Sequence, residues 1–326
     1  MTFKRSEHPD SLHLPCTPET IHWGYLSSDL ESVATIQCGQ HIKIDTVSGN
    51  TSRLPTDQHQ FSILPDHKKV ITQCKPHIGP HILTGPIHVN GAKPGDLLAV
   101  TIHDICLRQN WGWNEIEKGA GVLPELEDKN ETLTIPINPQ AETIQLPWGN
   151  TAKALPFFGV LAVKPSPDAG EVNSLIPSTF GGNMDIRLFR EGGTLHIPIH
   201  VDGAGFSVGD GHALQGDGEV VGTAVETALT GTFSFDVVSN CGVCFPYMKA
   251  SGKIIATAVS EDLNSAIRLA LREGIVLLTH YFDISEKDAY RHLSLLGDVR
   301  IAQLVNIAKG VYIDIDTSAL SALNNR

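Results

Sequence analysis

Short runs in which apolar and polar residues alternate fill the first 250 positions of this 326-residue chain. A period of two is typical of strands that bury one face. Glycine, proline, asparagine or aspartate bounds most of these runs, as expected where tight turns join strands. The pattern predicts short strands at Ile42–Val47, Leu97–Ile105, Thr132–Ile137, Leu195–Val201 and Val220–Val225.

The pattern changes after Ser260, where apolar residues recur at helical spacing. Ser260 and the acidic residues up to Asp262 resemble the start of a helix, because small polar side chains accept hydrogen bonds from free N–H groups there. Ser285 followed by Asp288 resembles a capping box with Asp in place of Glu, and it predicts a second helix. Gly297 is predicted to end that helix.

These elements together predict a mainly β fold, sandwich-like or barrel-like, with a smaller C-terminal α/β portion. The length is compatible with two domains or with one large β domain. We expect an N-terminal β domain over residues 1–155. We expect a second β domain over residues 156–326, which carries glycine- and aspartate-rich loops and the C-terminal helices.

The net charge is −12, from 24 basic and 36 acidic residues, and no run of basic residues could follow a phosphate backbone, so we predict no nucleic-acid partner. It also makes carboxylates available to hold a cation. The sequence contains no stretch apolar and long enough to span a bilayer and no export signal, so we predict a cytoplasmic protein without a membrane partner. A closed homodimer is the default oligomer.

The most unusual stretch runs from residue 209 to residue 219, where polar side chains alternate with glycine. Its candidate ligands and polar groups are Asp210, His212, Gln215, Asp217 and Glu219. In an extended chain, residues two apart point to the same face, so Asp210 and His212 share one. A single imidazole with several carboxylates suits zinc or manganese, and an oxygen-rich version suits calcium. In the alternative interpretation, these carboxylates only cap backbone donors in a turn.

A second candidate lies upstream, where Asn183 and Asp185 share a face if the chain is extended. The alternative is a plain loop. Four histidines from residue 77 to residue 103 make no HxH or HExxH pattern, and each is expected to be a surface or satisfied core histidine: His77, His81, His88 and His103.

Other chemistries receive less support from the sequence. Ser207 lies in a GxSxG pattern, but glycines follow it where a nucleophile elbow needs a helix. Cys241 and Cys244 form a lone CxxC pair and stay a minor alternative for a covalent route. Trp111 and Trp113 are expected either to wall a small pocket or to anchor the core.

Several of these stretches together resemble the acetamidase/formamidase family. The matching segments are Thr84–Asp96, Gly181–Asp185, Ser207–Glu219 with Glu226 just after it, and Ser294–Asp298. The last has Leu where the family has Ala. The first 75 residues match only loosely.

The resemblance implies a β-rich fold with a smaller α/β part, a divalent metal, and hydrolysis of formamide, acetamide or a related amide. Carried over by motif, the residues expected to line the site are Asn183, Asp185, Asp210, His212, Gln215 and Glu219. Members that act on other amides or lactams are the first alternative. A non-enzymatic β module that binds a metal or a sugar is the second.

A mechanism follows as a hypothesis. Asp185, Asp210 and His212 hold a metal, zinc first, with calcium or manganese as alternatives. Glu219 takes a proton from water and passes it to the departing nitrogen. Asn183 or Gln215 hydrogen-bonds the substrate oxygen or its NH₂ group.

Overall fold

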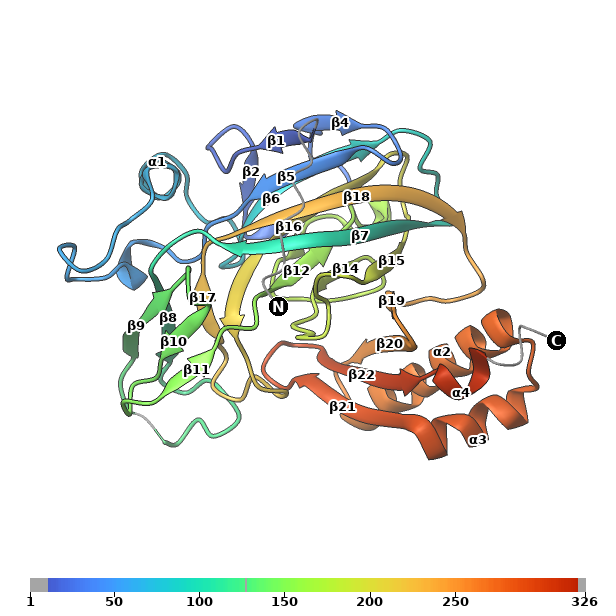
Figure 1. The fold of residues 1–326 in the computed structure, drawn as a ribbon. Helices are drawn as coiled ribbons and strands as arrows, with labels where there is room; N and C mark the ends of the chain where they lie inside the picture. Colours follow the sequence, from blue (N-terminus) through green and yellow to red (C-terminus); the bar gives the residue numbers. More distant parts are fainter. Residues whose placement is uncertain (1–10, 127, 322–326) are drawn as a thin grey trace.

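Two large β-sheets form most of the molecule, and the computed structural model describes residues 11–126 and 128–321 of the chain. The first sheet has nine strands. In spatial order they are β1 (Leu12–Leu14), β5 (His41–Asp45), β18 (Leu229–Ser239), β7 (Asp96–Leu107), β15 (Thr194–Pro198), β19 (Tyr247–Ala250), β20 (Lys253–Ser260), β22 (Lys309–Asp316) and β21 (Gly297–Gln303). The long strands β7 and β18 run across the molecule in Figure 1.

The second sheet has eleven strands. Its main path is β11 (Thr151–Lys153), β10 (Thr143–Gln145), β9 (Glu131–Asn138), β8 (Trp111–Ile116), β17 (Val225–Thr227), β16 (Ala204–Leu214), β12 (Phe157–Ala162) and β14 (Gly181–Asn183). A branch consists of β6 (Ile82–Val89), which pairs with β16, and of β2 (Ile21–Trp23) and β4 (Ala34–Ile36), which pair with β6. A separate pair joins β3 (Tyr25–Leu26) to β13 (Val172–Asn173).

The main core lies between the two sheets. Phe158 of β12 and Phe206 of β16 come from the second sheet, and both rings contact Phe233 of β18 in the first, with ring centroids 5.7 and 5.8 Å apart. Side chains that alternate to one face of each sheet fill this layer, which is the packing of a sandwich. The predicted mainly β, sandwich-like fold is therefore confirmed.

The helices gather near the C-terminus, apart from α1 (Pro65–Gln73) and the short 3₁₀ turns η1 (Thr51–Arg53) and η2 (Pro167–Ala169). They are α2 (Leu263–Phe282), α3 (Glu286–Leu296) and α4 (Ser318–Ser321). Helix α2 packs on β20 and β22 and makes the α/β part at one end of the molecule (Figure 1). None of the helices in the described residues is long and apolar enough to cross a membrane.

Both predicted helices are present, and the first begins after Asp262, because Ser260 is still the last residue of β20. The Asp262 side chain accepts a hydrogen bond from the Ser265 backbone N–H at the start of α2, 2.7 Å away. Ser285 caps α3 through the Asp288 backbone N–H, and Gly297 follows the last residue of the helix. In each first turn a side-chain acceptor satisfies one of the free backbone N–H groups, which fixes where the helix begins.

Four of the five predicted strands are present, but the strand predicted at Val220–Val225 is wrong. Residues 220–222 form a turn, and only Val225 belongs to a strand, β17. Gly222 has φ +96° and its backbone N–H bonds to the carbonyl oxygen of Glu219, 2.9 Å away. A glycine that closes a tight turn overrides the β preference of the valines beside it.

Strands from either side of residue 155 pair in both sheets. In the first sheet β5 and β7 lie beside β18, and in the second β8 lies beside β17. The division at residue 155 into two domains stays a prediction.

Candidate metal centre and active site

Asp210 and His212 lie two residues apart on β16, a strand that is buried along almost its whole length. Their side chains come together as the period-two pattern indicates, with His212 Nε2 3.2 Å from Asp210 Oδ2. Asp210 has φ +57°, in the left-handed region that non-glycine residues avoid. A backbone held in that region at a cost of about 1–3 kcal/mol is a feature of functional sites.

Gly159 of β12 makes room for this pair and for Asp185. A Cβ atom at Gly159 would lie 2.6 Å from Asp185 Oδ1, 2.8 Å from His212 Cε1 and closer still to Asp210 Oδ2. Asp185 Oδ1, Asp210 Oδ2 and the His212 ring therefore converge on one small volume that only a glycine leaves open. Three candidate ligands predicted from the sequence meet at this point.

Asp185 follows β14 and also has a left-handed backbone, with φ +53°. Asn306 Nδ2 donates to Asp185 Oδ2 at 2.8 Å, and Gln215 Nε2 donates to the Asp185 carbonyl oxygen at 2.9 Å. The second carboxylate oxygen, Oδ1, is buried and has no hydrogen-bond partner. Asp185 is thus held firmly by one oxygen while the other faces the Gly159 volume.

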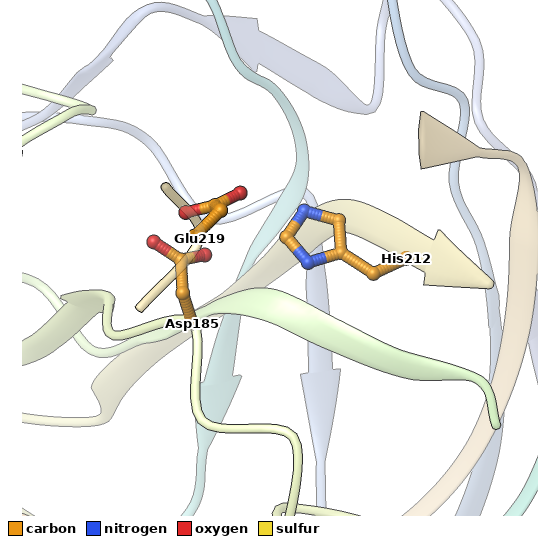
Figure 2. Close-up of side chains that lie close together, drawn as sticks. All are labelled: Asp185, His212 and Glu219. Carbon is orange, nitrogen blue, oxygen red and sulfur yellow. The ribbon is translucent and has the colours of Figure 1, made fainter. Parts of the chain in front are cut away.

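Glu219 reaches the same place from the turn after β16, with φ +44°. Figure 2 shows its carboxylate beside that of Asp185, with the His212 ring opposite. Among the described residues, two groups are spaced to hold a metal ion, and each has its ligand atoms within 4.8 Å of one another. They are Asp185, His212 and Glu219, and Asp210, His212 and Glu226.

Three contributors were not expected from the sequence as members of the site. Glu226 of β17 places Oε1 3.2 Å from His212 Nε2. His81 Nε2 lies 3.8 Å from Asp210 Oδ2, although we expected an ordinary surface or core histidine. Asn306, on the loop after β21, carries no sequence signal. Of the three, only Glu226 has a signal in the sequence, because it matches a glutamate of the family pattern.

The donor atoms fit a metal ion. The Nδ1 atom of His212 is buried without a hydrogen-bond partner, and its Nε2 atom lies 3.2 Å from the carboxylates of both Asp210 and Glu226. Buried polar atoms are paired in almost all folded proteins, so unpaired ones that converge with carboxylates call for a ligand. An imidazole and carboxylates are donors that zinc and manganese accept.

Charges inside the site shift the pKa values in opposite directions. Burial and the charge of Asp210 raise the pKa of Asp185 to about 7. Burial also acts to raise the pKa of Asp210, but the charges of His81 and His212 outweigh it and lower that pKa. Burial and the charge of Asp185 raise the pKa of Glu219 well above its usual value. Divergent pKa values among close carboxylates mark candidate acid–base groups.

A cavity of about 610 Å³ leads to this cluster. Asp210, Glu219 and Glu226 line it at the site, and Asn183 lies there with its Oδ1 buried and without a partner. Trp113 also lines the cavity. Trp111 is fully buried in the core and donates from Nε1 to the Ser62 carbonyl oxygen. Trp113 therefore walls the pocket, and Trp111 anchors the core.

Gln215 and Asp217 do not reach the cavity. Gln215 donates to the backbone of Asp185, as described above, and its Oε1 atom has no partner. Asp217 belongs to neither metal-binding group and bonds instead to Arg187 and Tyr312. The alternation that links Asp210 to His212 ends with β16 at Leu214, which explains why Asp217 points elsewhere.

Neither alternative nucleophile lies at the cavity. Ser207 is buried inside β16, and its hydroxyl lies 2.9 Å from His22 Nε2, while His22 Nδ1 lies 2.6 Å from the Tyr25 carbonyl oxygen. Cys241 and Cys244 lie after β18 and next to α2. None of these residues lines the cavity.

The buried His22, which lies beside the Ser207 hydroxyl, should make the protein less stable in acid. Burial lowers the pKa of His22 to about 4, against 6.5 for an exposed histidine. Between pH 6.5 and pH 4, His22 therefore binds a proton in the unfolded chain but not in the folded chain. The contribution of neutral His22 to the free energy of unfolding is complete above pH 6.5 and is lost as the pH falls to 4. We expect the loss to be about 3 kcal/mol.

Urea unfolding of the wild type and of His22→Gln at pH 7 and pH 4 measures this contribution. The variant should lose less free energy of unfolding than the wild type over that interval. Equal losses in the two proteins would show that His22 does not titrate as described.

A mainly β protein with a buried carboxylate–imidazole cluster at a cavity is the class that these observations define. The model of the Acetamidase/Formamidase family matches residues 18–174 and 169–317, and the chain belongs to this family.

Three relatives illustrate the likeness. The acetamidase of Mycolicibacterium smegmatis is 24% identical over 273 residues, which cover 66% of this chain and 64% of that protein. The crystal structure of the acetamidase of Yersinia enterocolitica is 28% identical, with a TM-score of 0.83 and coverage of 97% of this chain and 94% of that one. That of the acetamidase of Bacillus halodurans is 25% identical, with a TM-score of 0.82 and coverage of 96% and 99%. The chain spans less than two thirds of the length of the curated relatives it matches.

Proposed function

We propose that this protein hydrolyses a small primary amide, formamide or acetamide, to a carboxylate and ammonia with the help of a divalent metal. The observation that carries the proposal is that two groups spaced to hold a metal share His212 beside Gly159, one with Asp185 and Glu219 and the other with Asp210 and Glu226. The names of the relatives, acetamidase and formamidase, support the same substrate class.

Asp185, Asp210 and His212 would hold the metal, with Glu226 as a further carboxylate at His212 Nε2. Zinc is the first choice for this donor set, followed by manganese and calcium. When bound, the metal supplies a Lewis acid that polarises the amide carbonyl and makes water more acidic.

Glu219 moves the proton. Its carboxylate lines the cavity and accepts the proton of the attacking water as the new C–O bond forms. It then donates this proton to the nitrogen as the C–N bond breaks, so that ammonia leaves and a carboxylic acid remains. The acid then loses its own proton to give the carboxylate. Burial raises the pKa of Glu219 well above its usual value, which suits a group that must hold a proton between these two steps.

Asn183 orients the substrate. Its Oδ1 atom is buried, has no partner and lies on a residue that lines the cavity, so it can accept a hydrogen bond from the substrate NH₂ group. Gln215 already donates to the Asp185 backbone, and we assign it to holding Asp185 in place rather than to the substrate.

A pure binding module needs no proton-transfer group beside its ligands, which favours an enzyme. The cavity volume of about 610 Å³ exceeds what acetamide needs and favours a second candidate, a larger amide or a lactam. The cytoplasmic location and the homodimer stay predictions.

Ammonia release with and without a chelator tests the proposal. We expect the purified protein to release ammonia from formamide or acetamide, to lose this activity on chelation and to regain it with one equivalent of zinc or manganese. Hydrolysis that survives complete removal of metal would contradict the proposal. Bound metal without turnover of either amide, but with turnover of longer amides or lactams, would select the second candidate.

A further inference from the structure

Asp185 and Glu219 belong to different segments of the chain. An ion pair joins the two segments, and each of its members lies two residues from one of these carboxylates. Arg187 lies two residues after Asp185, and Asp217 lies two residues before Glu219. Arg187 Nε donates to Asp217 Oδ1 at 2.8 Å and Arg187 Nη2 to Oδ2 at 3.2 Å. A bidentate pair of this kind fixes both the distance and the angle between its two segments.

A tyrosine of the α/β part completes the arrangement. The hydroxyl of Tyr312, on β22, donates to the same carboxylate, with Oδ1 3.0 Å and Oδ2 2.9 Å away. Tyr312 is fully buried, so the packing around its ring holds the hydroxyl in place relative to β22. The three side chains therefore tie both site segments to the C-terminal part of the fold.

Backbone hydrogen bonds beside the ion pair also connect the Glu219 turn to the C-terminal part of the fold. The Gly218 N–H donates to the Ala302 carbonyl oxygen at 2.9 Å, and the Leu304 N–H donates to the Gly218 carbonyl oxygen at 3.0 Å. The turn that carries Glu219 is thus paired with the end of β21, just ahead of Asn306, the residue that holds Asp185 Oδ2.

Both site carboxylates need such support. Asp185 and Glu219 have left-handed backbones, and an isolated turn would relax toward ordinary conformations. We propose that Arg187, Asp217 and Tyr312 are positioning residues, which set the separation of Asp185 and Glu219 through the C-terminal α/β part. This inference rests on the proposed function, because it assigns these residues to the same metal site.

Three conservative variants test the inference: Arg187→Lys, which keeps the charge but loses the bidentate geometry, Asp217→Asn and Tyr312→Phe. We expect each to weaken zinc binding by about 10–100-fold, the usual effect of losing a group that orients metal ligands. The value of kcat should fall together with the zinc affinity, while KM should change less. Tyr281→Phe, which removes a hydroxyl bonded to Tyr247 far from the site turn, should change none of these.

A double-mutant cycle shows whether the pair acts as a unit. If it does, Arg187→Lys combined with Asp217→Asn should cost little more than either change alone. Fully additive losses would contradict a joint role.

Hydrogen exchange of the metal-free proteins separates this inference from the proposed function. The wild type should protect the Gly218 and Leu304 amides, and the three variants should lose that protection while thermal unfolding confirms that they are folded. A wild type that binds neither zinc nor manganese nor calcium would defeat the proposed function, and the exchange comparison would still decide the present inference. Wild-type protection and wild-type zinc affinity in both Asp217→Asn and Tyr312→Phe would overturn it.

Discussion

Glu219→Gln should reduce kcat for acetamide or formamide by about 10²–10⁴-fold, the usual contribution of a general acid–base group. The amide side chain keeps the size of the carboxylate but neither accepts nor returns the proton. Because Asp185, Asp210 and His212 remain, we expect the variant to keep its metal. Steady-state ammonia release and elemental analysis of the same preparation measure the two quantities together.

The matched control is Glu286→Gln, an exposed glutamate in the first turn of α3, which should behave as the wild type. Two results would count against the assigned role of Glu219. Turnover close to that of the wild type would show that the proton moves elsewhere. Loss of the metal together with activity would make Glu219 a ligand, as its spacing to Asp185 and His212 also allows.

Gly159→Ala should abolish metal binding and lower activity by about 10²-fold or more, since a displacement of about 1 Å in a catalytic group has effects of that size. The added methyl group would lie within 2.8 Å of atoms of Asp185, Asp210 and His212, and these groups cannot all remain in place. The backbone of Gly159 is not left-handed, so alanine introduces only the collision. Isothermal titration with zinc measures the loss.

Gly216→Ala is the matched control for this substitution. Gly216 lies in the site turn, but no atom is within 4 Å of the position its Cβ would take, and its φ is also outside the left-handed region. We expect near wild-type zinc binding in this variant. Wild-type zinc affinity in Gly159→Ala would show that the metal lies away from the Gly159 volume.

Local pattern was sufficient for most of the fold and for part of the site. Alternation along residues 204–214 places Asp210 and His212 on one face, because that segment is a single strand. Helix α2 begins where Asp262 can cap it, and α3 begins after Ser285 for the same reason. These features depend on neighbours within a few residues, which a sequence displays directly.

The remaining parts of the site depend on contacts between distant segments. His81 and Asn306 reach the cluster through the pairing of β6 with β16 and through the loop after β21, and neither has a local signal. Asp217 looks like a ligand in the sequence, yet Arg187 and Tyr312 draw it away from the site. The valines at positions 220, 221 and 225 predict a strand, but the hydrogen bond from the Gly222 N–H to the Glu219 carbonyl oxygen closes a turn there instead.

The position of the metal is the central claim, and anomalous diffraction at the zinc edge from crystals of active protein tests it most directly. We predict a single dominant peak in the carboxylate–imidazole cluster beside Gly159, where a ring nitrogen of His212 and the Asp185 or Asp210 carboxylate would hold the ion. A peak elsewhere in the molecule, or no peak in crystals of protein that still hydrolyses acetamide, would contradict the account.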